Sequence, residues 1–189
     1  MTLLMALLAL LRYTRDKDNS INDYSEDKYW DEFERSIPMS TYLVAFIISD
    51  FNHKKVDNFK VWAKPNAVDQ TTYALNIGTR GLDHLIKRFK QSYQISKMDM
   101  VAVPDFSAGA MENWGLVTYR ESRLLHDEKS TSDAAKQSIA SVIIHELTHM
   151  WFGNMITPEW WGYLWLSEGF ARYFQYFATA QVIATISFF

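Results

Sequence analysis

The stretch from Ser132 to Asn154 places the strongest constraint on the fold, because it has the pattern of one long amphipathic helix. Residues four positions apart lie on the same face of a helix, so His145 and His149 would stand side by side there, with Glu146 close to them. The residues around these three are apolar and recur at helical spacing: Ile139, Val142, Ile143, Ile144, Met150 and Trp151. Unpaired polar side chains are costly to bury in such surroundings. We therefore expect the three polar side chains to serve one buried site.

The spacing His-Glu-x-x-His is typical of a catalytic zinc site. Imidazole nitrogens bind zinc at about 2.0–2.1 Å, and a carboxylate beside the metal can take a proton from metal-bound water. Glu168 follows His149 with eighteen residues between them, in a second helical pattern. We expect one Zn²⁺ ion held by His145, His149 and Glu168, with Glu146 as the general base. A buried helix carrying two histidines that bind no metal is the competing interpretation.

Composition and charge limit the class of protein. With 189 residues and 48% hydrophobic content, the chain is long enough to bury a sizeable core. The formal net charge is −3 and no basic run occurs, so we expect no nucleic-acid partner. No stretch of about 18 apolar residues occurs, so we expect no transmembrane segment in this chain. The lack of cysteine allows a reducing compartment and does not exclude an extracellular one.

The remaining sequence predicts several strands and one further helix. Residues 12–35 are charged and poor in aliphatic side chains, so residues 1–35 are expected to be an atypical, disordered segment. β-Branched and aromatic content predicts a buried strand at 39–51. Alternation of apolar and polar residues predicts a half-buried strand at 59–64, and further strands are expected at 98–103 and 115–120. Residues 69–93 predict a helix with Asp69 as its N-cap, weakened by Gly78 and Gly81. This order of elements favours an α+β fold.

The other histidines and the aromatic residues of the last helical pattern are expected to have structural roles. No other possible metal ligand lies at a suitable spacing from His53, His84 or His126. We expect His53 to lie in a turn, His84 to be solvated, and His126 to lie in a loop. The helical pattern that starts at Trp165 carries an aromatic stripe, which we expect to be core rather than a cofactor site: Phe170, Tyr173, Phe174 and Phe177.

Three motifs together make the sequence similar to a known enzyme family. They are Gly109-Ala110-Met111-Glu112-Asn113, His145-Glu146-Leu147-Thr148-His149, and Glu168 at its spacing from the second motif. Val103-Pro104-Asp105-Phe106 precedes the first motif, and Trp151-Phe152-Gly153-Asn154 follows the second. On these residues the chain resembles the M1 family of zinc aminopeptidases (gluzincins), especially the aminopeptidase N group, from about Ser36 to about Ala180.

The resemblance implies a fold and a division into domains. It implies a thermolysin-like zinc-peptidase lobe preceded by the end of a β domain. Residues 36–57 would hold the last strand region of that N-terminal β domain, and residues 58–189 would form a partial thermolysin-like catalytic domain. It also implies a plasma-membrane or extracellular location, with the cytoplasm as the alternative.

The resemblance further implies a zinc-dependent aminopeptidase that removes N-terminal residues from peptides by means of a Glu-activated, zinc-bound water. Zn²⁺ would be held by the two motif histidines and Glu168. Glu112 would hold the free α-amine of the substrate, and the whole substrate-binding set would be Gly109, Ala110, Met111, Glu112 and Asn113. A fixed carboxylate facing an ammonium, a few ångströms from a metal, admits one residue before the scissile bond, which makes an exopeptidase.

The chain departs from the family pattern beyond these motifs. M1 enzymes stabilise the oxyanion with a tyrosine far downstream of the zinc helix, and the chain ends before that region. We therefore expect a truncated form with impaired activity, unless Tyr119 or Tyr163 takes that role. Two alternatives stay open: a catalytically inactive zinc-binding or interaction fragment, and a zinc endopeptidase in which Glu112 is merely structural.

Overall fold

A five-stranded mixed sheet forms the centre of the molecule. The computed structural model describes residues 4–7, 12–17 and 29–186, with side chains described from residue 33 to residue 184. The strand order in the sheet is β5-β6-β7-β9-β8. The strands are β5 (Asn52–Val56), β6 (Phe59–Ala63), β7 (Met98–Val103), β8 (Ala110–Met111) and β9 (Leu116–Arg120). The three central strands run parallel, and β5 and β8 pair antiparallel at the two edges.

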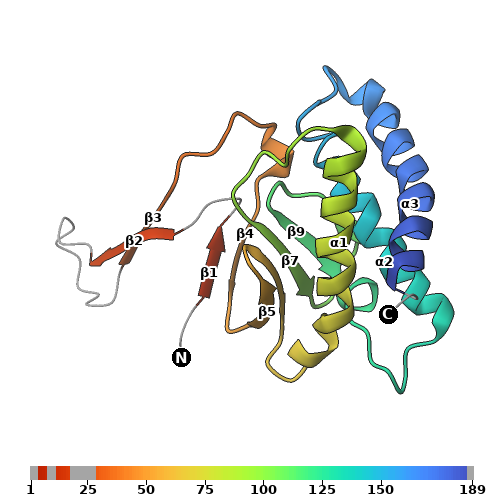
Figure 1. The fold of residues 1–189 in the computed structure, drawn as a ribbon. Helices are drawn as coiled ribbons and strands as arrows, with labels where there is room; N and C mark the ends of the chain where they lie inside the picture. The colour runs from red at the N-terminus through yellow and green to blue at the C-terminus, as the bar shows by residue number, and fades with distance from the viewer. Residues whose placement is uncertain (1–3, 8–11, 18–28, 187–189) are drawn as a thin grey trace.

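Three α-helices of the described chain cover one face of this sheet (Figure 1). They are α1 (Thr72–Phe89), α2 (Asp133–His149) and α3 (Leu164–Ile186). Helix α2 packs against both α1 and α3. Short 3₁₀ helices complete the description: η1 (Thr41–Leu43), η2 (Val68–Thr71), η3 (Glu121–Arg123) and η4 (Trp161–Tyr163). Helices gathered on one side of a mixed sheet are compatible with the expected α+β class.

The opposite face of the sheet is covered by the chain around β4 (Phe46–Ser49), which pairs with β1 (Leu4–Leu7). A smaller apolar cluster lies between this segment and the sheet: Trp62, Val101 and Leu116, with Ala45, Ile47, Phe51 and Val103 packed against them. A separate antiparallel pair is formed by β2 (Arg12–Lys17) and β3 (Tyr29–Phe33). Helices therefore cover one face of the central sheet, and residues 45–51 pack on the other.

The predicted buried strand at 39–51 is wrong in length and in burial. Residues 41–43 form η1, and only Phe46–Ser49 form a strand. Successive side chains of a strand point to opposite sides, so Ile47 packs on the sheet while Phe46 and Ile48 are 64% and 49% exposed. Apolar composition alone does not distinguish a strand covered on both faces from one covered on a single face.

The N-terminal part of the chain differs from the expectation of a disordered segment. The structure places β1, β2 and β3 within residues 1–35, while residues 1–3, 8–11 and 18–28 lie outside the described part. The domain boundary expected between residues 57 and 58 falls in the turn of the β5–β6 hairpin, at Asp57 with φ of 49°. The division of the chain into domains stays a prediction.

Two helices have boundaries that differ from the predicted ones. Helix α1 follows η2 and begins at Thr72, and Asp69 makes no side-chain cap there. Ser132 caps α2 by accepting a hydrogen bond from the Ala135 amide at 3.2 Å, but the helix ends at His149 instead of continuing to Asn154. Gly153 has φ of 133°, a conformation that side-chain-bearing residues rarely adopt, and the chain turns there.

Among the described residues, no helix combines the length and apolar content needed to cross a membrane.

Candidate metal centre

Three side chains from two helices converge on one point. Nε2 of His145 and Nε2 of His149, both on α2, lie 3.1 Å apart. Glu168 on α3 brings Oε2 to 3.4 Å from the first nitrogen and Oε1 to 3.7 Å from the second. Ligands held tetrahedrally at 2.0–2.1 Å from one ion are separated by about 3.3 Å, so these three distances suit one shared ion.

The outer nitrogens of both imidazoles are held by hydrogen bonds. Nδ1 of His145 lies 3.1 Å from Oε1 of Gln175 on α3, and Nε2 of Gln175 donates to Oγ of Ser141 at 2.6 Å. Nδ1 of His149 lies 2.9 Å from the carbonyl oxygen of Phe152. A carbonyl oxygen only accepts hydrogen bonds, so Nδ1 carries the proton in each neutral ring and Nε2 presents a lone pair to the centre.

The donor set fits a zinc ion. Two facing Nε2 lone pairs and a carboxylate, with no proton between the nitrogens, repel one another unless a cation lies among them. Two imidazole nitrogens and one carboxylate oxygen are a ligand set that zinc accepts, with a fourth position left open. Half of the Glu168 side chain is exposed, so the centre is open to solvent on the α3 side.

A second acidic group adjoins this centre. Glu112, Glu146 and His149 are all buried, and one ligand atom of each lies within 4.8 Å of the others. Burial, followed by the charges of Glu112 and Glu168, raises the pKa of the Glu146 carboxyl well above its usual range. A cation at the neighbouring centre would act in the opposite direction and favour the anionic form. Glu146 and Glu112 therefore both adjoin His149, one of the two histidines of the centre.

The segment from Gly109 to Asn113 reaches the centre with only part of its length. Ala110 and Met111 form the edge strand β8, and Glu112 directly follows it, with its carbonyl bound by Nδ2 of Asn154 at 3.0 Å. Asn113 accepts a hydrogen bond from Thr118 at 3.1 Å and donates one to the carbonyl of Leu43 at 3.3 Å. Gly109 is exposed at the far end of β8, where its carbonyl accepts from the Arg120 amide. Glu112 is thus the member of the segment that the fold brings beside the histidines.

The other three histidines lie away from this centre. His53 is part of β5, where its ring packs on Trp62 with centroids 4.1 Å apart, so the predicted turn position is wrong. His126 packs on Tyr73 at 5.0 Å. Nε2 of His84 is buried and has no hydrogen-bond partner among the described residues, which contradicts the prediction of a solvated side chain.

Neither tyrosine proposed from the sequence as an oxyanion group faces open space at the centre. Tyr119 is fully buried under α2, and its hydroxyl has no partner in the described part of the chain. Burial, with the charge of Glu146 as a smaller cause, raises the pKa of Tyr119. Tyr163 is 53% exposed and lines a different cavity together with Phe152 and Phe170.

Two residues near the centre were missed by the sequence analysis. Gln175 lies seven residues after Glu168 and so falls on the same face of α3, a spacing that pointed to it. Tyr42, on η1, donates a hydrogen bond to the carbonyl of Gly153 at 3.3 Å. Burial raises the pKa of Tyr42, and the charges of Glu112 and Glu168 raise it further. No sequence pattern signalled Tyr42, because it reaches the centre from a separate segment.

The aromatic stripe of α3 is only partly core. Phe174 packs edge-on against Phe89 of α1, with centroids 4.8 Å apart. Phe170 and Tyr173 are 45% and 61% exposed, which differs from the predicted core role. A helix that packs through one face leaves the remainder of a wide aromatic stripe in contact with solvent.

Comparison with known proteins places the chain in a family. Residues 73–188 match the model of the Peptidase family M1 domain. The chain belongs to peptidase family M1. It is 47% identical over 162 residues to aminopeptidase N of Canis lupus familiaris, which is 81% of this chain and 17% of that protein. It is 42% identical over 179 residues to glutamyl aminopeptidase of Bos taurus, covering 91% of this chain and 18% of the relative.

A third relative is endoplasmic reticulum aminopeptidase 2 of Homo sapiens, 45% identical over 165 residues, which are 84% of this chain and 17% of the relative. The matched region thus spans about a sixth of the length of these M1 relatives. The residues that match the family model, 73–188, include the candidate metal centre described above and the Gly109–Asn113 segment.

Proposed function

We propose that this M1 chain carries the zinc-binding part of an aminopeptidase active site and acts on peptides with a free N-terminus. The observation that supports this most directly is the meeting of His145, His149 and Glu168, with Glu146 and Glu112 buried beside them. The names of the relatives, aminopeptidase N and glutamyl aminopeptidase among them, agree with this function.

Each side chain has a distinct role in the proposed reaction. A zinc ion at the centre would supply Lewis acidity, which polarises the scissile carbonyl and lowers the pKa of water to about 7. Glu146 takes a proton from the attacking water and delivers it to the leaving amine. Gln175 and the Phe152 carbonyl keep both Nε2 atoms turned inward by binding the Nδ1 protons.

Glu112 gives the proposed reaction its exopeptidase character. Its carboxylate lies with Glu146 and His149 in one buried group, where an ammonium would form a charge-assisted ion pair. Edge strand β8 ends immediately before Glu112, and within the described chain it pairs only with β9, so its other edge suits an extended peptide backbone. An α-amine held at Glu112 leaves room for one residue before the metal.

Metal analysis tests the first half of this proposal. The purified chain is expected to bind one zinc ion, and His149→Ala is expected to abolish binding because it removes one of three ligands. His126→Ala serves as the matched control, since this ring packs on Tyr73 away from the centre. Equal zinc content in the two variants would disprove the ligand assignment.

Substrate comparison tests the second half and separates the alternatives. An aminopeptidase hydrolyses an alanine anilide and spares the N-acetylated form, whereas an endopeptidase cleaves internal bonds of N-blocked peptides. A zinc-loaded chain that binds peptides without cleaving either substrate would support the inactive binding form instead. Slow turnover by the 189-residue chain, relative to a full-length M1 aminopeptidase, stays a prediction that the same assay measures.

A further inference from the structure

Three segments that lie far apart in the sequence are tied together near the end of α2. They are residues 42–43 on η1, residues 112–113 directly after β8, and residues 153–154 shortly after α2. A side chain of each segment donates a hydrogen bond to the backbone of another: Asn154 to the Glu112 carbonyl at 3.0 Å, Asn113 to the Leu43 carbonyl at 3.3 Å, and Tyr42 to the Gly153 carbonyl at 3.3 Å. The three bonds close a cycle, which we call the three-segment brace.

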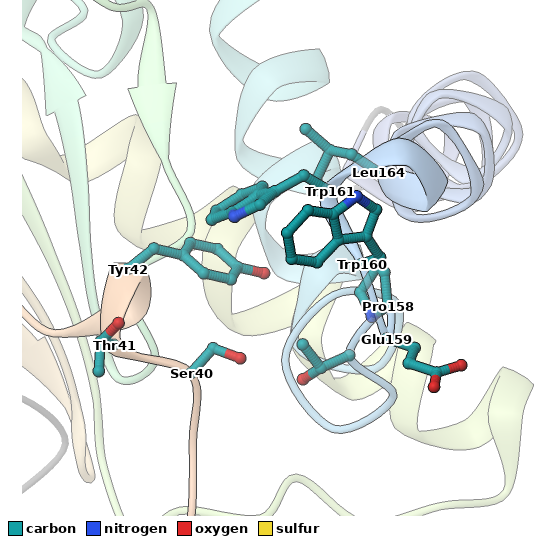
Figure 2. Close-up of a pocket in the computed structure, with 9 residues that line it drawn as sticks. Ser40, Thr41, Tyr42, Pro158, Glu159, Trp160, Trp161 and Leu164 are labelled. Atoms are coloured by element: carbon teal, nitrogen blue, oxygen red, sulfur yellow. The ribbon is translucent and has the colours of Figure 1, made fainter.

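The brace lies in a largely buried part of the molecule. Leu43, Asn113 and Asn154 are almost completely shielded from solvent. The ring of Tyr42 packs against that of Trp161, with centroids 5.2 Å apart, where η1 meets η4 (Figure 2). Hydrogen bonds in such low-dielectric surroundings are electrostatically stronger than in water. The brace therefore holds its three segments in one arrangement.

Asn154 joins the helix that carries both histidines to the backbone of Glu112. Its amide N–H donates to the His149 carbonyl at 3.0 Å, and its carbonyl accepts from the Thr157 hydroxyl at 2.8 Å. Its side-chain Oδ1 is buried without a hydrogen-bond partner among the described residues, and Nδ2 also lies 3.5 Å from Sδ of Met150. The backbone of Asn154 thus belongs to the end of α2, and its side chain supplies the link to Glu112.

The position of the Glu112 carboxylate depends on this link. The side chain is 8% exposed and lies with Glu146 and His149 in one buried group. Within the described chain no hydrogen bond holds the carboxylate itself, so its place follows from the place of the backbone. Strand β8 before it is only two residues long and pairs only with β9 there. The bond from Asn154 is therefore the direct tie between the Glu112 backbone and the end of α2.

We propose that Asn154 is a positioning residue that sets the distance from the Glu112 carboxylate to the metal centre. A fixed distance selects substrates whose amine lies on the carbon next to the scissile carbonyl, because a misplacement of about 1 Å can cost about 100-fold. The inference rests on the proposed function, in which Glu112 holds the substrate amine. It goes beyond that function by assigning the choice between an α-amine and a β-amine to Asn154.

Three small hydroxamates test this distance without any turnover. A hydroxamate chelates zinc through its two oxygens, so each probe presents its amine at a set distance from the metal. Alanine hydroxamate carries an α-amine, its isomer β-alanine hydroxamate carries the amine one carbon further away, and acetohydroxamate carries none. Calorimetry on the zinc-loaded chain gives the three affinities. The unaltered chain is expected to bind the α-amine probe about 10- to 100-fold more tightly than the β-amine probe.

Asn154→Leu keeps nearly the same side-chain shape and removes the donor to Glu112. It should lower the preference for the α-amine probe at least about five-fold and leave zinc content and acetohydroxamate affinity unchanged, because the backbone bonds of residue 154 to α2 remain. If Asn154→Leu does not fold, Asn154→Ser carries the same expectation, since its shorter side chain cannot span to the Glu112 carbonyl.

Asn58→Leu is the matched control. Nδ2 of Asn58 also donates to a backbone carbonyl, that of Ser96, at 3.1 Å. It precedes β6, which β7 and β9 separate from β8 in the sheet. This change should leave all three affinities unaltered. A preference for the α-amine probe that survives in the folded Asn154 variant, or that falls equally in Asn58→Leu, would overturn the proposal.

The same titrations separate this inference from the proposed function. If the unaltered chain binds alanine hydroxamate no better than acetohydroxamate, the amine role of Glu112 fails and the inference fails with it. If the unaltered chain prefers the α-amine probe and the Asn154 variant keeps that preference, the proposed function stands and only the role of Asn154 is lost. An equal fall in the affinities of all three probes would show that Asn154 supports the metal centre instead, which also contradicts the inference.

Discussion

Gln175 on α3 accepts a hydrogen bond from Nδ1 of His145 on α2, with the two atoms 3.1 Å apart. The amide of Gln175 is itself fixed, because its Nε2 donates to Ser141 and its oxygen also accepts from Arg172. One side chain of α3 thereby sets the ring orientation of a candidate zinc ligand on the neighbouring helix. Loss of such an outer contact typically lowers metal affinity about 10- to 100-fold.

Replacing Gln175 with alanine should lower zinc affinity about 10- to 100-fold, because the His145 ring loses the acceptor that orients it. Competition with a chromogenic chelator measures the change. Gln181→Ala is the matched control, since Gln181 is an exposed glutamine on the same helix. Unchanged affinity in Gln175→Ala would show that the ring is oriented by other contacts.

Glu112→Gln should weaken binding of a free amine and leave zinc in place. A charge-assisted hydrogen bond is worth about 1.5–3 kcal/mol, so affinity for alanine amide should fall about 10- to 100-fold, while N-acetylalanine amide is unaffected. Calorimetry on the zinc-loaded chain gives both affinities. Glu121→Gln changes an equally charged residue that pairs with Lys64 and should alter neither. Parallel losses for the two amides would contradict the amine role of Glu112.

Gly81 allows α1 to approach α2 closely, and Gly81→Ala should destabilise the fold. An added Cβ would press on Cδ1 of Ile144, and overpacking costs about 1–3 kcal/mol, more than the helix propensity gained. Ile144→Val removes that methyl group, so the double variant should recover much of the loss in urea unfolding. Gly169→Ala on α3 meets no atom within 4 Å and should not destabilise the chain. Additive effects of the two core changes would rule out the contact as the cause.

Tyr93 should make stability fall at alkaline pH. Burial, with the charge of Asp99, raises its pKa above the ordinary 10.0, so the folded state keeps a proton that the unfolded chain releases. Below pH 10 this tyrosine is protonated in both states, so the free energy of unfolding does not change with its titration. As the pH rises above 10, the free energy of unfolding falls by up to about 1.4 kcal/mol per pH unit. Tyr93→Phe should therefore show a shallower decline in urea unfolding between pH 9 and pH 11.

At pH 8 the same Tyr93→Phe change should cost little stability, because the hydroxyl has no hydrogen-bond partner in the described chain. Tyr176→Phe is the control, since this ring is 60% exposed. A decline at high pH that is the same in Tyr93→Phe and in the unaltered chain would assign the effect to other groups.

Strand and helix types were predictable where one local pattern decided them. Strands were predicted at 98–103 and 115–120, and β7 and β9 lie there with nearly all of their side chains buried. The prediction for 39–51 was wrong because the same apolar residues suit a strand, a 3₁₀ turn or a segment covered on one side only. Gly78 and Gly81 were predicted to weaken α1, whereas the structure uses them for close packing against Phe59 and Ile144.

The sequence by itself determined the relation between His145 and His149, because helix geometry puts residues four apart on one face whatever surrounds the helix. It also determined the family, through motifs whose order and spacing are local. Only the tertiary structure decided the partners of those histidines, Gln175 and the Phe152 carbonyl, and the hydrogen bond from Tyr42 to the Gly153 carbonyl. These relations depend on how α3 and η1 pack on α2, and packing is set by the shapes of many side chains at once rather than by any spacing along the chain.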